Sequence, residues 1–286
     1  MISDILKHWN MADATVTELT RPHMSEGERT IWDVDGRYML KLQPDCVIKL
    51  AQLLADEGIP VARYLPMVDG NMITQDGYAL MTKIEGTHID LFEQPHLTVE
   101  FGRQLGRLHR ALAKIETHFD DLEDSNFLEQ WHDYIVPGLG DGVCNDFRNA
   151  VEAKLTEICP KLPHQLIHRD VHCQNTLFDD GKLVGWIDFD LHHRNARIFD
   201  MAYLLVYLIF GSQHDPIKVE KWRRICDQLM SAYDEANPLT AEERAALPLM
   251  MTAIELLFVS FWNREGNAEQ SGAALDLAKW LWNRKW

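Results

Sequence analysis

Residues 168–175 read HRDVHCQN, and residues 187–190 read IDFD. The first run places Asp170 five positions before Asn175, and the second run places Asp188 after a short apolar approach. Two carboxylates and an amide are groups that handle protons and hard metal ions in proteins. These two runs decide how the chain is interpreted.

A β-hairpin is expected between the two runs. The turn signal is Asp179-Asp180-Gly181, and strands are expected at 176–178 and 183–187. The loop that ends at Asn175 and the strand that ends near Asp188 would then meet at one mouth. The sequence therefore predicts that the polar groups of the two runs share a site.

Phosphoryl transfer is the chemistry that these groups suit best. Such a reaction needs a group that positions or deprotonates the acceptor hydroxyl, and magnesium ions that bridge and neutralise the phosphates. In this interpretation Asp170 acts at the acceptor hydroxyl, whereas Asn175 and Asp188 supply oxygen ligands to Mg2+. We therefore predict a kinase that uses Mg2+ and ATP, and the preference for ATP over GTP stays open.

At these residues the chain resembles the aminoglycoside phosphotransferase and choline kinase superfamily, whose members carry H-x-D-x-x-x-x-N and then I-D-F/W-[DE]. His168 opens the first motif and Asp190 closes the second. Residues 195–202, NARIFDMA, resemble the downstream D-[LIM]-A element of the superfamily. The resemblance implies that Asp200 braces the catalytic loop, and that Asp190 assists the metal or the substrate.

The resemblance extends to the first part of the chain. Residues 81–86, MTKIEG, resemble the hinge that joins the two lobes of these kinases. It implies that the carbonyl group of Thr82 and the N–H group of Ile84 face the purine. The fold that it implies is α+β and bilobal, like a protein kinase. A small antiparallel N-lobe with one helix would span residues 1–85, and a larger, mostly helical C-lobe would span residues 86–286.

The hydrophobic pattern predicts individual elements within these lobes. Three Asp-Gly pairs separate short runs that are expected to be strands, at 30–34, 37–42, 71–74 and 78–82. One helical face is formed between them by Val47, Leu50, Ala51 and Leu54. After Pro95, Thr98 can cap a helix that runs to Ile115. Further helices are expected at 200–211, 216–234, 240–264 and 269–284.

Lys41 alternates with apolar neighbours in the expected strand 37–42 and resembles the lysine with which kinases hold the α- and β-phosphates. Kinases fix that lysine with a Glu on the following helix. Here the middle of that helix offers Lys49 and Gln52, so the carboxylate partner of Lys41 stays open. The phosphate-covering loop at 24–29, MSEGER, contains a single glycine, and its contribution stays open as well.

The acceptor is expected to be a small hydroxylated molecule. Eleven residues separate Asp188 from Asp200 and no A-P-E follows, which leaves no room for the activation segment of a protein kinase. The candidates for the wall of the acceptor site are Asp190, His192, His193, Arg194, Glu255, Trp262 and Arg264. For Glu255 and Trp262, core packing with a charge at the rim is the more ordinary explanation.

The composition is that of an ordinary folded protein of 286 residues, with 46% hydrophobic and 25% charged residues. Five dispersed cysteines indicate reduced thiols, and the absence of a signal-peptide pattern predicts a cytoplasmic protein.

A formal net charge of −16 argues against nucleic acid or a membrane as a partner, and it permits a cationic substrate. The aromatic tail, Trp280, Trp282 and Trp286, is expected to dock on the C-lobe or on a second copy in a homodimer.

Three alternative interpretations stay open. The first motif could be an ordinary strand end with a solvated charge pair. The missing helix Glu and the glycine-poor loop are also compatible with a pseudokinase that binds nucleotide and serves as a scaffold. Finally, imidazole and carboxylate groups suit zinc or iron in a metal-dependent hydrolase. The candidate ligands are His168, Asp170, His172, Cys173, His192 and His193.

Overall fold

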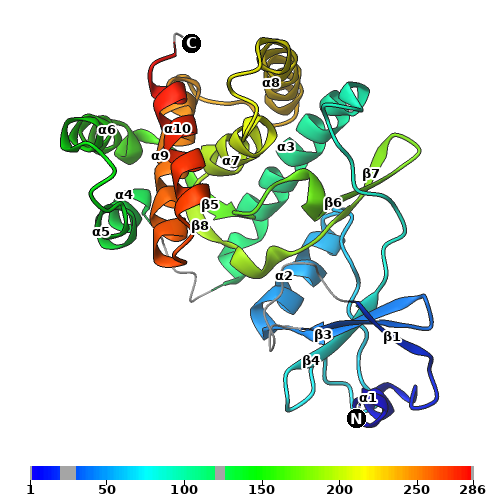
Figure 1. Ribbon diagram of the computed structural model, residues 1–286. Coiled ribbons are helices and arrows are strands. Elements are labelled where there is room, and N and C mark those ends of the chain that lie inside the picture. The colour runs from blue at the N-terminus through cyan, green and yellow to red at the C-terminus, as the bar shows by residue number, and fades with distance from the viewer. Residues whose placement is uncertain (1, 20–29, 120–125, 285–286) are drawn as a thin grey trace. The chain divides into compact units, whose positions relative to one another are not determined.

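The chain folds into two units, each built from two separate stretches of sequence (Figure 1). The computed structural model describes residues 2–19, 30–119 and 126–284. The first unit comprises Met1–His88 and Thr176–Asp190, and the second comprises Ile89–Asn175 and Leu191–Trp286. The expected hairpin after Asn175 therefore belongs to the same unit as the N-terminal sheet.

The first unit is built on one antiparallel sheet of strand order β1-β2-β3-β4. Leu40 of β3 pairs with Trp32 of β2 on one side and with Leu80 of β4 on the other. The elements of this part of the chain are α1 (Ile2–Leu6), the 3-10 helix η1 (Lys7–Trp9), β1 (Val16–Leu19), β2 (Ile31–Val34), β3 (Tyr38–Leu42), α2 (Asp45–Asp56) and β4 (Tyr78–Thr82). The strands expected near β2, β3 and β4 are thus confirmed, whereas β1 has mostly exposed side chains and gave no hydrophobic signal.

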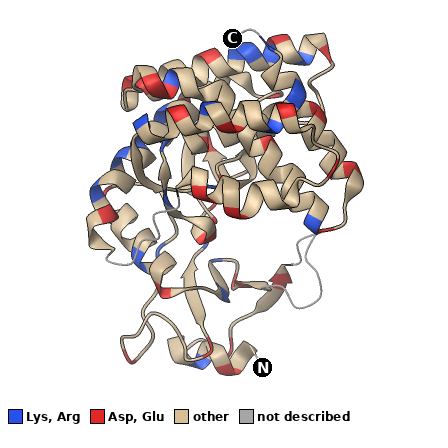
Figure 2. Cartoon of the chain, turned by 90° about the vertical axis from the view of Figure 1, so that its left-hand side faces the viewer, with Lys and Arg blue, Asp and Glu red and all other residues tan. Residues whose placement is uncertain are grey.

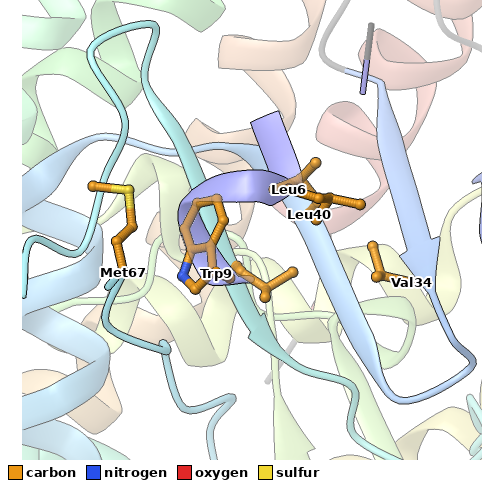
Figure 3. Close-up of a cluster of buried hydrophobic side chains, with 6 residues drawn as sticks. Leu6, Trp9, Val34, Leu40 and Met67 are labelled. Carbon is orange, nitrogen blue, oxygen red and sulfur yellow. The ribbon is translucent and has the colours of Figure 1, made fainter. Parts of the chain in front are cut away.

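The two faces of this sheet are covered by different helices. Leu40 and Leu80 belong to a buried cluster with Leu6 and Trp9 of the N-terminal helices. Figure 3 labels five members of this cluster: Leu6, Trp9, Val34, Leu40 and Met67. Ala79, which precedes Leu80, packs instead with Ile48 and Ala51 of α2. Successive side chains of a strand point to opposite faces. Lys41, next to Leu40, therefore lies on the face that α2 covers.

The strand expected at 71–74 is absent from the structure. Asp69 accepts hydrogen bonds from the backbone N–H and from the side-chain amide of Asn71, each at 3.0 Å. Gly70 between them has a φ of +89°. An aspartate side chain that accepts a hydrogen bond from the backbone N–H two residues later stabilises a turn. Such a turn competes with strand formation. The prediction was wrong because this local side-chain bonding outweighs the hydrophobic alternation.

The hairpin consists of β6 (Thr176–Asp179) and β7 (Lys182–Trp186), as expected around Asp179-Asp180-Gly181. It is attached to the rest of the first unit by two further bridges. Phe178 and Thr87 exchange backbone hydrogen bonds of 2.9 Å, and the N–H of Trp186 donates to the carbonyl of Pro60 at 2.8 Å. These bonds place the hairpin beside Pro60, which precedes β4, and beside Thr87, which follows it.

The second unit is mainly helical. Its principal helices are α3 (Thr98–Ile115), α6 (Asn145–Ile158), α7 (Ile198–Ile209), α8 (Pro216–Ala236), α9 (Ala241–Arg264) and α10 (Ala268–Trp282). Between them lie β5 (His164–Ile167), β8 (His193–Ala196) and short helices: η2 (Pro95–Leu97), η3 (Glu116–His118), α4 (Phe127–Gln130), the π-helical η4 (Trp131–Ile135), α5 (Val136–Gly138), η5 (Cys159–Lys161), η6 (Cys173–Asn175) and η7 (Phe189–Leu191), of which η7 straddles the boundary between the units. The helices expected after Pro95 and after Asp200 are confirmed within a few residues.

α3 packs closely against α8. A Cβ atom added to Gly102 would lie 2.4 Å from the carbonyl oxygen of Leu229, so only glycine allows this approach of the two backbones. Thr98 does not cap α3: it is the first residue of the helix, follows η2 directly and makes no capping hydrogen bond. The 3-10 helix η2 runs directly into α3, so the cap position is occupied by Leu97 and not by Thr98.

α9 is the central apolar helix of the second unit and packs against α7 and α10. By length and composition it could cross a membrane, but most of it is buried inside the structure, as is usual for a core helix. The aromatic tail docks on this unit, where the ring of Trp280 lies 5.8 Å from that of Trp222. Trp286 lies outside the described residues. Figure 2 shows acidic and basic residues interspersed along the helices and loops.

Candidate active site

The first unit holds a cavity of about 310 Å³ on the α2 face of its sheet. Most of its walls are apolar, with contributions from Met39, Val47, Ala51, Met81 and Leu177. Apolar clefts of this size with a few polar groups are typical of small-ligand sites. Four of the residues that the sequence singled out line this cavity: Lys41, Thr82, Ile84 and Asp188.

Two consecutive backbone N–H groups of the hinge segment are hydrogen-bonded to neighbouring carbonyl groups. The N–H of Thr82 donates to the carbonyl of Arg63 at 2.8 Å, and the N–H of Lys83 donates to that of Arg37 at 2.9 Å. Within residues 2–19, 30–119 and 126–284, the N–H of Ile84 makes no such bond. Gly185 permits close packing here, because a Cβ atom at that position would lie 2.9 Å from Cγ2 of Ile84. The hinge is therefore held firmly and keeps a donor for a ligand.

Lys41 pairs with Asp190 and not with a residue of α2. Its Nζ atom lies 3.7 Å from Oδ1 of Asp190, and the side-chain amide of Gln43 donates to the same oxygen at 2.6 Å. The carboxylate partner of Lys41 is thus Asp190, at the end of the second motif. Gln43 was missed, because nothing in a single glutamine two residues after Lys41 signals a role.

Asp188 directly follows Ile187 and has a φ of +66°, a left-handed conformation that is uncommon outside glycine. Burial raises the pKa of Tyr64, and the negative charges of Asp190 and Asp188 raise it further. Tyr64 and Asp188 both line the cavity. The strained backbone at Asp188 therefore directs a carboxylate into an already negative pocket, an arrangement that a cation would relieve.

In the second unit, the first motif is anchored by a buried carboxylate. Asp200 of α7 is fully buried and accepts hydrogen bonds from the backbone N–H groups of His168, at 2.9 Å, and Arg169, at 2.7 Å. Its Oδ2 atom also lies 3.0 Å from Nε2 of His109, whose Nδ1 atom is 2.7 Å from the hydroxyl of Tyr233. Residues of three helices, α3, α7 and α8, thus form the network that holds the loop. His109 and Tyr233 were missed, since no local pattern marks them.

Arg169 also has a left-handed backbone, with a φ of +72°. Its guanidinium group donates to Nδ1 of His193 at 3.0 Å. Burial, together with the charge of Arg169, lowers the pKa of His193 to about 4, so this imidazole stays neutral and accepts the bond. The strained conformation is thereby held from both sides, by Asp200 at the backbone and by His193 at the side chain.

Asp170 is ionised at neutral pH. Burial alone would raise its pKa, but hydrogen bonding and charge from His172, a hydrogen bond from Tyr203 and the charge of His168 lower it to about 2. The Nε2 atom of His172 lies 3.5 Å from Oδ1 of Asp170. A carboxylate in this state accepts a hydrogen bond from a hydroxyl group readily.

Asn175 is oriented by Asp170. Its Nδ2 atom donates both to the backbone carbonyl and to Oδ2 of Asp170, each at 2.9 Å. Because both bonds use the nitrogen, Oδ1 is the atom of the amide that is left to bind a ligand. Thr176, the next residue, begins the hairpin of the first unit.

Only some of the residues that were expected to form the acceptor wall line a common cavity. Glu255 and Trp262 line a second cavity, of about 450 Å³, in the second unit. His193 is engaged by Arg169, and the Nε atom of Arg194 lies 3.7 Å from Oε2 of Glu116. Arg264 lies over the ring of Tyr134 at 4.5 Å. The ring of His192 lies 6.4 Å from that of Phe119. These four side chains have structural contacts and do not line that cavity.

The geometry gives no support to the transition-metal interpretation. In the described part of the chain, no three His, Cys, Asp or Glu side chains are grouped so that they could hold a metal ion. Burial raises the pKa of Cys173 to about 12, which keeps its thiol protonated. The loop at 24–29 lies outside the described residues.

The comparison with known protein families adds a decisive observation. The sequence model APH, described as the phosphotransferase enzyme family, matches residues 29–239. The chain belongs to this family. Homoserine kinase from Polaromonas naphthalenivorans is 26% identical over 247 residues, which cover 79% of this chain and 75% of that protein.

Solved structures of similar fold include other kinases of small molecules. Amicoumacin kinase hAmiN, in complex with AMP-PNP, Ca2+ and Ami, has a TM-score of 0.65 at 18% identity and covers 97% of this chain and 92% of its own. The GDP and kanamycin complex of APH(2")-IIia has a TM-score of 0.71 at 14% identity, with coverage of 99% and 98%. The expected α+β, protein-kinase-like fold is confirmed.

Membership of the phosphotransferase enzyme family also confirms the predicted reaction class. The protein is a small-molecule kinase, which transfers a phosphoryl group to a hydroxyl group. Membership of this family favours the catalytic interpretation of the first motif over an ordinary strand end. Lys41 has a carboxylate partner after all, which removes one of the two reasons for considering a pseudokinase.

Proposed function

We propose that this kinase transfers the γ-phosphoryl group of ATP to a hydroxyl of a small molecule, with Asp170 as the group that accepts the hydroxyl proton. The observation that carries the proposal is the state of Asp170. Its carboxylate is ionised, is bonded by Asn175, and sits on a loop whose N–H groups bind the buried Asp200. A charged oxygen held in one place suits a hydroxyl that must attack in line.

In the proposed reaction the acceptor oxygen forms a bond to the γ-phosphorus. The bond between that phosphorus and the oxygen that bridges it to the β-phosphate breaks, and ADP leaves with the electron pair. The hydroxyl proton passes to a carboxylate oxygen of Asp170 and then to solvent. Tyr203 and His172, which hydrogen-bond to that carboxylate, keep its oxygens directed while the proton moves.

The nucleotide is proposed to occupy the cavity of the first unit. The donor at Ile84 N–H and the acceptor at Thr82 C=O would meet the purine, as the resemblance of the hinge implies. Lys41, fixed by Asp190 and Gln43, would neutralise phosphate charge. We propose ATP rather than GTP, and since one neighbouring structure holds AMP-PNP and another GDP, both nucleotides need to be assayed.

The proposed metal is Mg2+, with Asn175 and Asp188 as its protein ligands. The donor set fits: the amide of Asn175 has its oxygen left over, and Asp188 contributes a carboxylate from a strained position. When bound, Mg2+ would neutralise the phosphates and orient them. Asp190, which already binds Lys41 and Gln43, is proposed to hold the nucleotide side of the site and not the metal.

The acceptor is proposed to be a small hydroxylated molecule that reaches Asp170. Relatives and neighbours carry the names of kinases for homoserine and amicoumacin, which shows the range of acceptors but does not select one. The net charge of −16 supports an acceptor that is not itself strongly anionic, and it argues against nucleic acid as a partner.

The test is an ADP-release assay with ATP or GTP, Mg2+ and a panel of amino alcohols, sugars and aminoglycosides. We expect acceptor-dependent turnover, and we expect Asp170→Asn to reduce kcat by about 10²- to 10⁴-fold, the usual contribution of a general base. The matched control is Asp180→Asn in the exposed turn of the hairpin, which should leave kcat unchanged. An Asp170→Asn enzyme within threefold of the wild type would show that Asp170 has another role.

A further inference from the structure

Gln43 is a buried amide that directly follows β3, two residues after Lys41, and only 3% of its surface is exposed. Its backbone N–H donates to the carbonyl of Gly77 at 2.9 Å, which continues the pairing of β3 with β4. Pro44 follows, and a residue before proline is restricted to an extended conformation. Residues two apart in an extended chain share a face. The side chain of Gln43 therefore lies on the same face as that of Lys41.

The amide of Gln43 has one partner. Its Nε2 atom donates to Oδ1 of Asp190 at 2.6 Å, whereas Oε1 is buried and has no hydrogen-bond partner in the described part of the chain. A buried amide oxygen without a partner costs free energy, and an apolar side chain of similar size would avoid that cost. Packing therefore does not explain a glutamine at this position, but the bond to Asp190 does.

The same oxygen of Asp190 lies near Lys41. Nζ of Lys41 is 3.7 Å from Oδ1, whereas an N–H···O hydrogen bond usually spans about 2.7–3.2 Å. The ion pair is thus looser than the bond from Gln43. The amide holds the carboxylate in place, and the lysine can turn toward a phosphate oxygen while it stays close to its counter-charge.

α2 contributes two apolar residues to the cavity of the first unit, Val47 and Ala51. The two carboxylates of this helix, Asp45 and Asp56, are its first and last residues and are exposed. Protein kinases fix the corresponding lysine with a Glu on this helix. Here the carboxylate and the amide that hold the lysine both come from outside α2, and all three groups belong to the first unit.

We propose that Gln43 is the positioning residue for the phosphate-binding lysine: its amide holds Asp190, Asp190 holds Lys41, and α2 takes no part. This inference rests on the proposed function for the role of Lys41 at the phosphates. An amide suits the position because it directs a donor at the carboxylate and adds no second negative charge beside the phosphates.

The first experiment measures the binding of ADP and of adenosine by calorimetry, with Mg2+ and without an acceptor. Gln43→Met keeps the length of the side chain and removes the donor. We expect it to weaken ADP binding by about 5- to 30-fold and to change adenosine binding by less than about twofold, because the lysine meets phosphates and not the base.

The matched control is Gln52→Met in the middle of α2, which should leave the binding of both ligands unchanged. Unchanged ADP binding in Gln43→Met would overturn the inference. So would an equal loss for ADP and adenosine, since that pattern indicates a damaged cavity and not a misplaced lysine. An ADP loss in Gln52→Met as large as that in Gln43→Met would show that α2 does take part.

Lys41→Met tests the proposed function separately, and we expect it to weaken ADP binding by at least about tenfold. If it does so while Gln43→Met has no effect, the inference fails and the proposed function stands. If Lys41→Met has no effect on ADP binding, the proposed role of Lys41 fails and the inference fails with it.

The second experiment asks whether Gln43 acts through Asp190. Adding Gln43→Met to Asp190→Ala should weaken ADP binding no further than Asp190→Ala alone, because the amide has then already lost its partner. Losses of the two changes that simply multiply would mean that Gln43 acts on the nucleotide independently of Asp190, which contradicts the proposal. Circular dichroism confirms that each variant is folded.

Discussion

The two buried glutamates of α9 occupy very different surroundings. Glu243, near the start of the helix, is fully buried and receives two hydrogen bonds from the guanidinium group of Arg197, at 2.8 and 2.5 Å. It also closes a capping box with Thr240. Glu255, three turns later on the same helix, is equally buried, but its Oε2 atom has no partner in the described part of the chain.

Glu243 is therefore paired within the protein, whereas Oε2 of Glu255 has no hydrogen-bond partner in the described part of the chain. The Arg197 guanidinium also donates to the side chain of Asn237 and to the carbonyl of Pro238, so it ties the end of α8 to the start of α9. A buried ion pair whose hydrogen bonds are all made is costly to break. A buried carboxyl group without a partner is costly to ionise, which is why burial raises the pKa of Glu255 to about 8.

The largest expected effect comes from replacing each glutamate by methionine, which keeps the volume and removes the carboxyl group. Glu243→Met leaves Arg197 buried without its partner and should lower the free energy of unfolding by about 3–5 kcal/mol. Burial raises the pKa of Glu255 to about 8, so at neutral pH Glu255→Met removes a mostly neutral, buried polar group and should leave that free energy unchanged or raise it. Urea unfolding at neutral pH measures both. Similar losses in the two variants would show that the two glutamates contribute to stability in the same way.

The pH dependence of stability provides an intermediate effect. The pKa of Glu255 is about 8 in the folded state against an ordinary value of 4.5, so the folded state holds a proton that the unfolded state has released between these values. Stability should therefore fall as pH rises through this window, by up to about 1.4 kcal/mol per pH unit for this one group.

The measurement is the difference in the free energy of unfolding between the wild type and Glu255→Met, from pH 4 to pH 9. Because His172, Tyr203 and Tyr207 line the same cavity in both proteins, their titration largely cancels in this difference. We expect a difference that grows in favour of the variant up to about pH 8 and is flat above it. A difference that stays constant with pH would mean that Glu255 titrates normally.

The smallest expected effect concerns a carboxylate that is paired but partly exposed. The side chains of Lys41 and Asp190 are 11% and 23% exposed, and their charged atoms lie 3.7 Å apart. Asp190→Asn should therefore cost only about 1 kcal/mol of unfolding free energy, well below the loss for Glu243→Met. Thermal unfolding of the two variants side by side checks this order. A loss for Asp190→Asn as large as that for Glu243→Met would show that burial does not govern the strength of these pairs.

Much of the fold was predictable because it depends on short-range patterns. The alternation around Lys41 predicted β3, and the spacing of Phe101, Leu105 and Leu108 predicted the buried face of α3. The strand predicted at 71–74 failed, since the Asp69 side chain closes a turn that alternation does not reveal. β8 was missed as well: it has few apolar residues, and its pairing with β5 follows from the packing of distant segments.

The sequence by itself determined the reaction class, because the spacing of Asp170, Asn175 and Asp188 is local and chemically demanding. Only the tertiary structure decided which groups these residues meet. It paired Lys41 with Asp190, placed His109 against Asp200, and left Glu255 buried beside Tyr203. Such partners come from segments far apart in the chain, and their meeting depends on how whole helices and strands pack. These partners were therefore beyond the reach of the sequence.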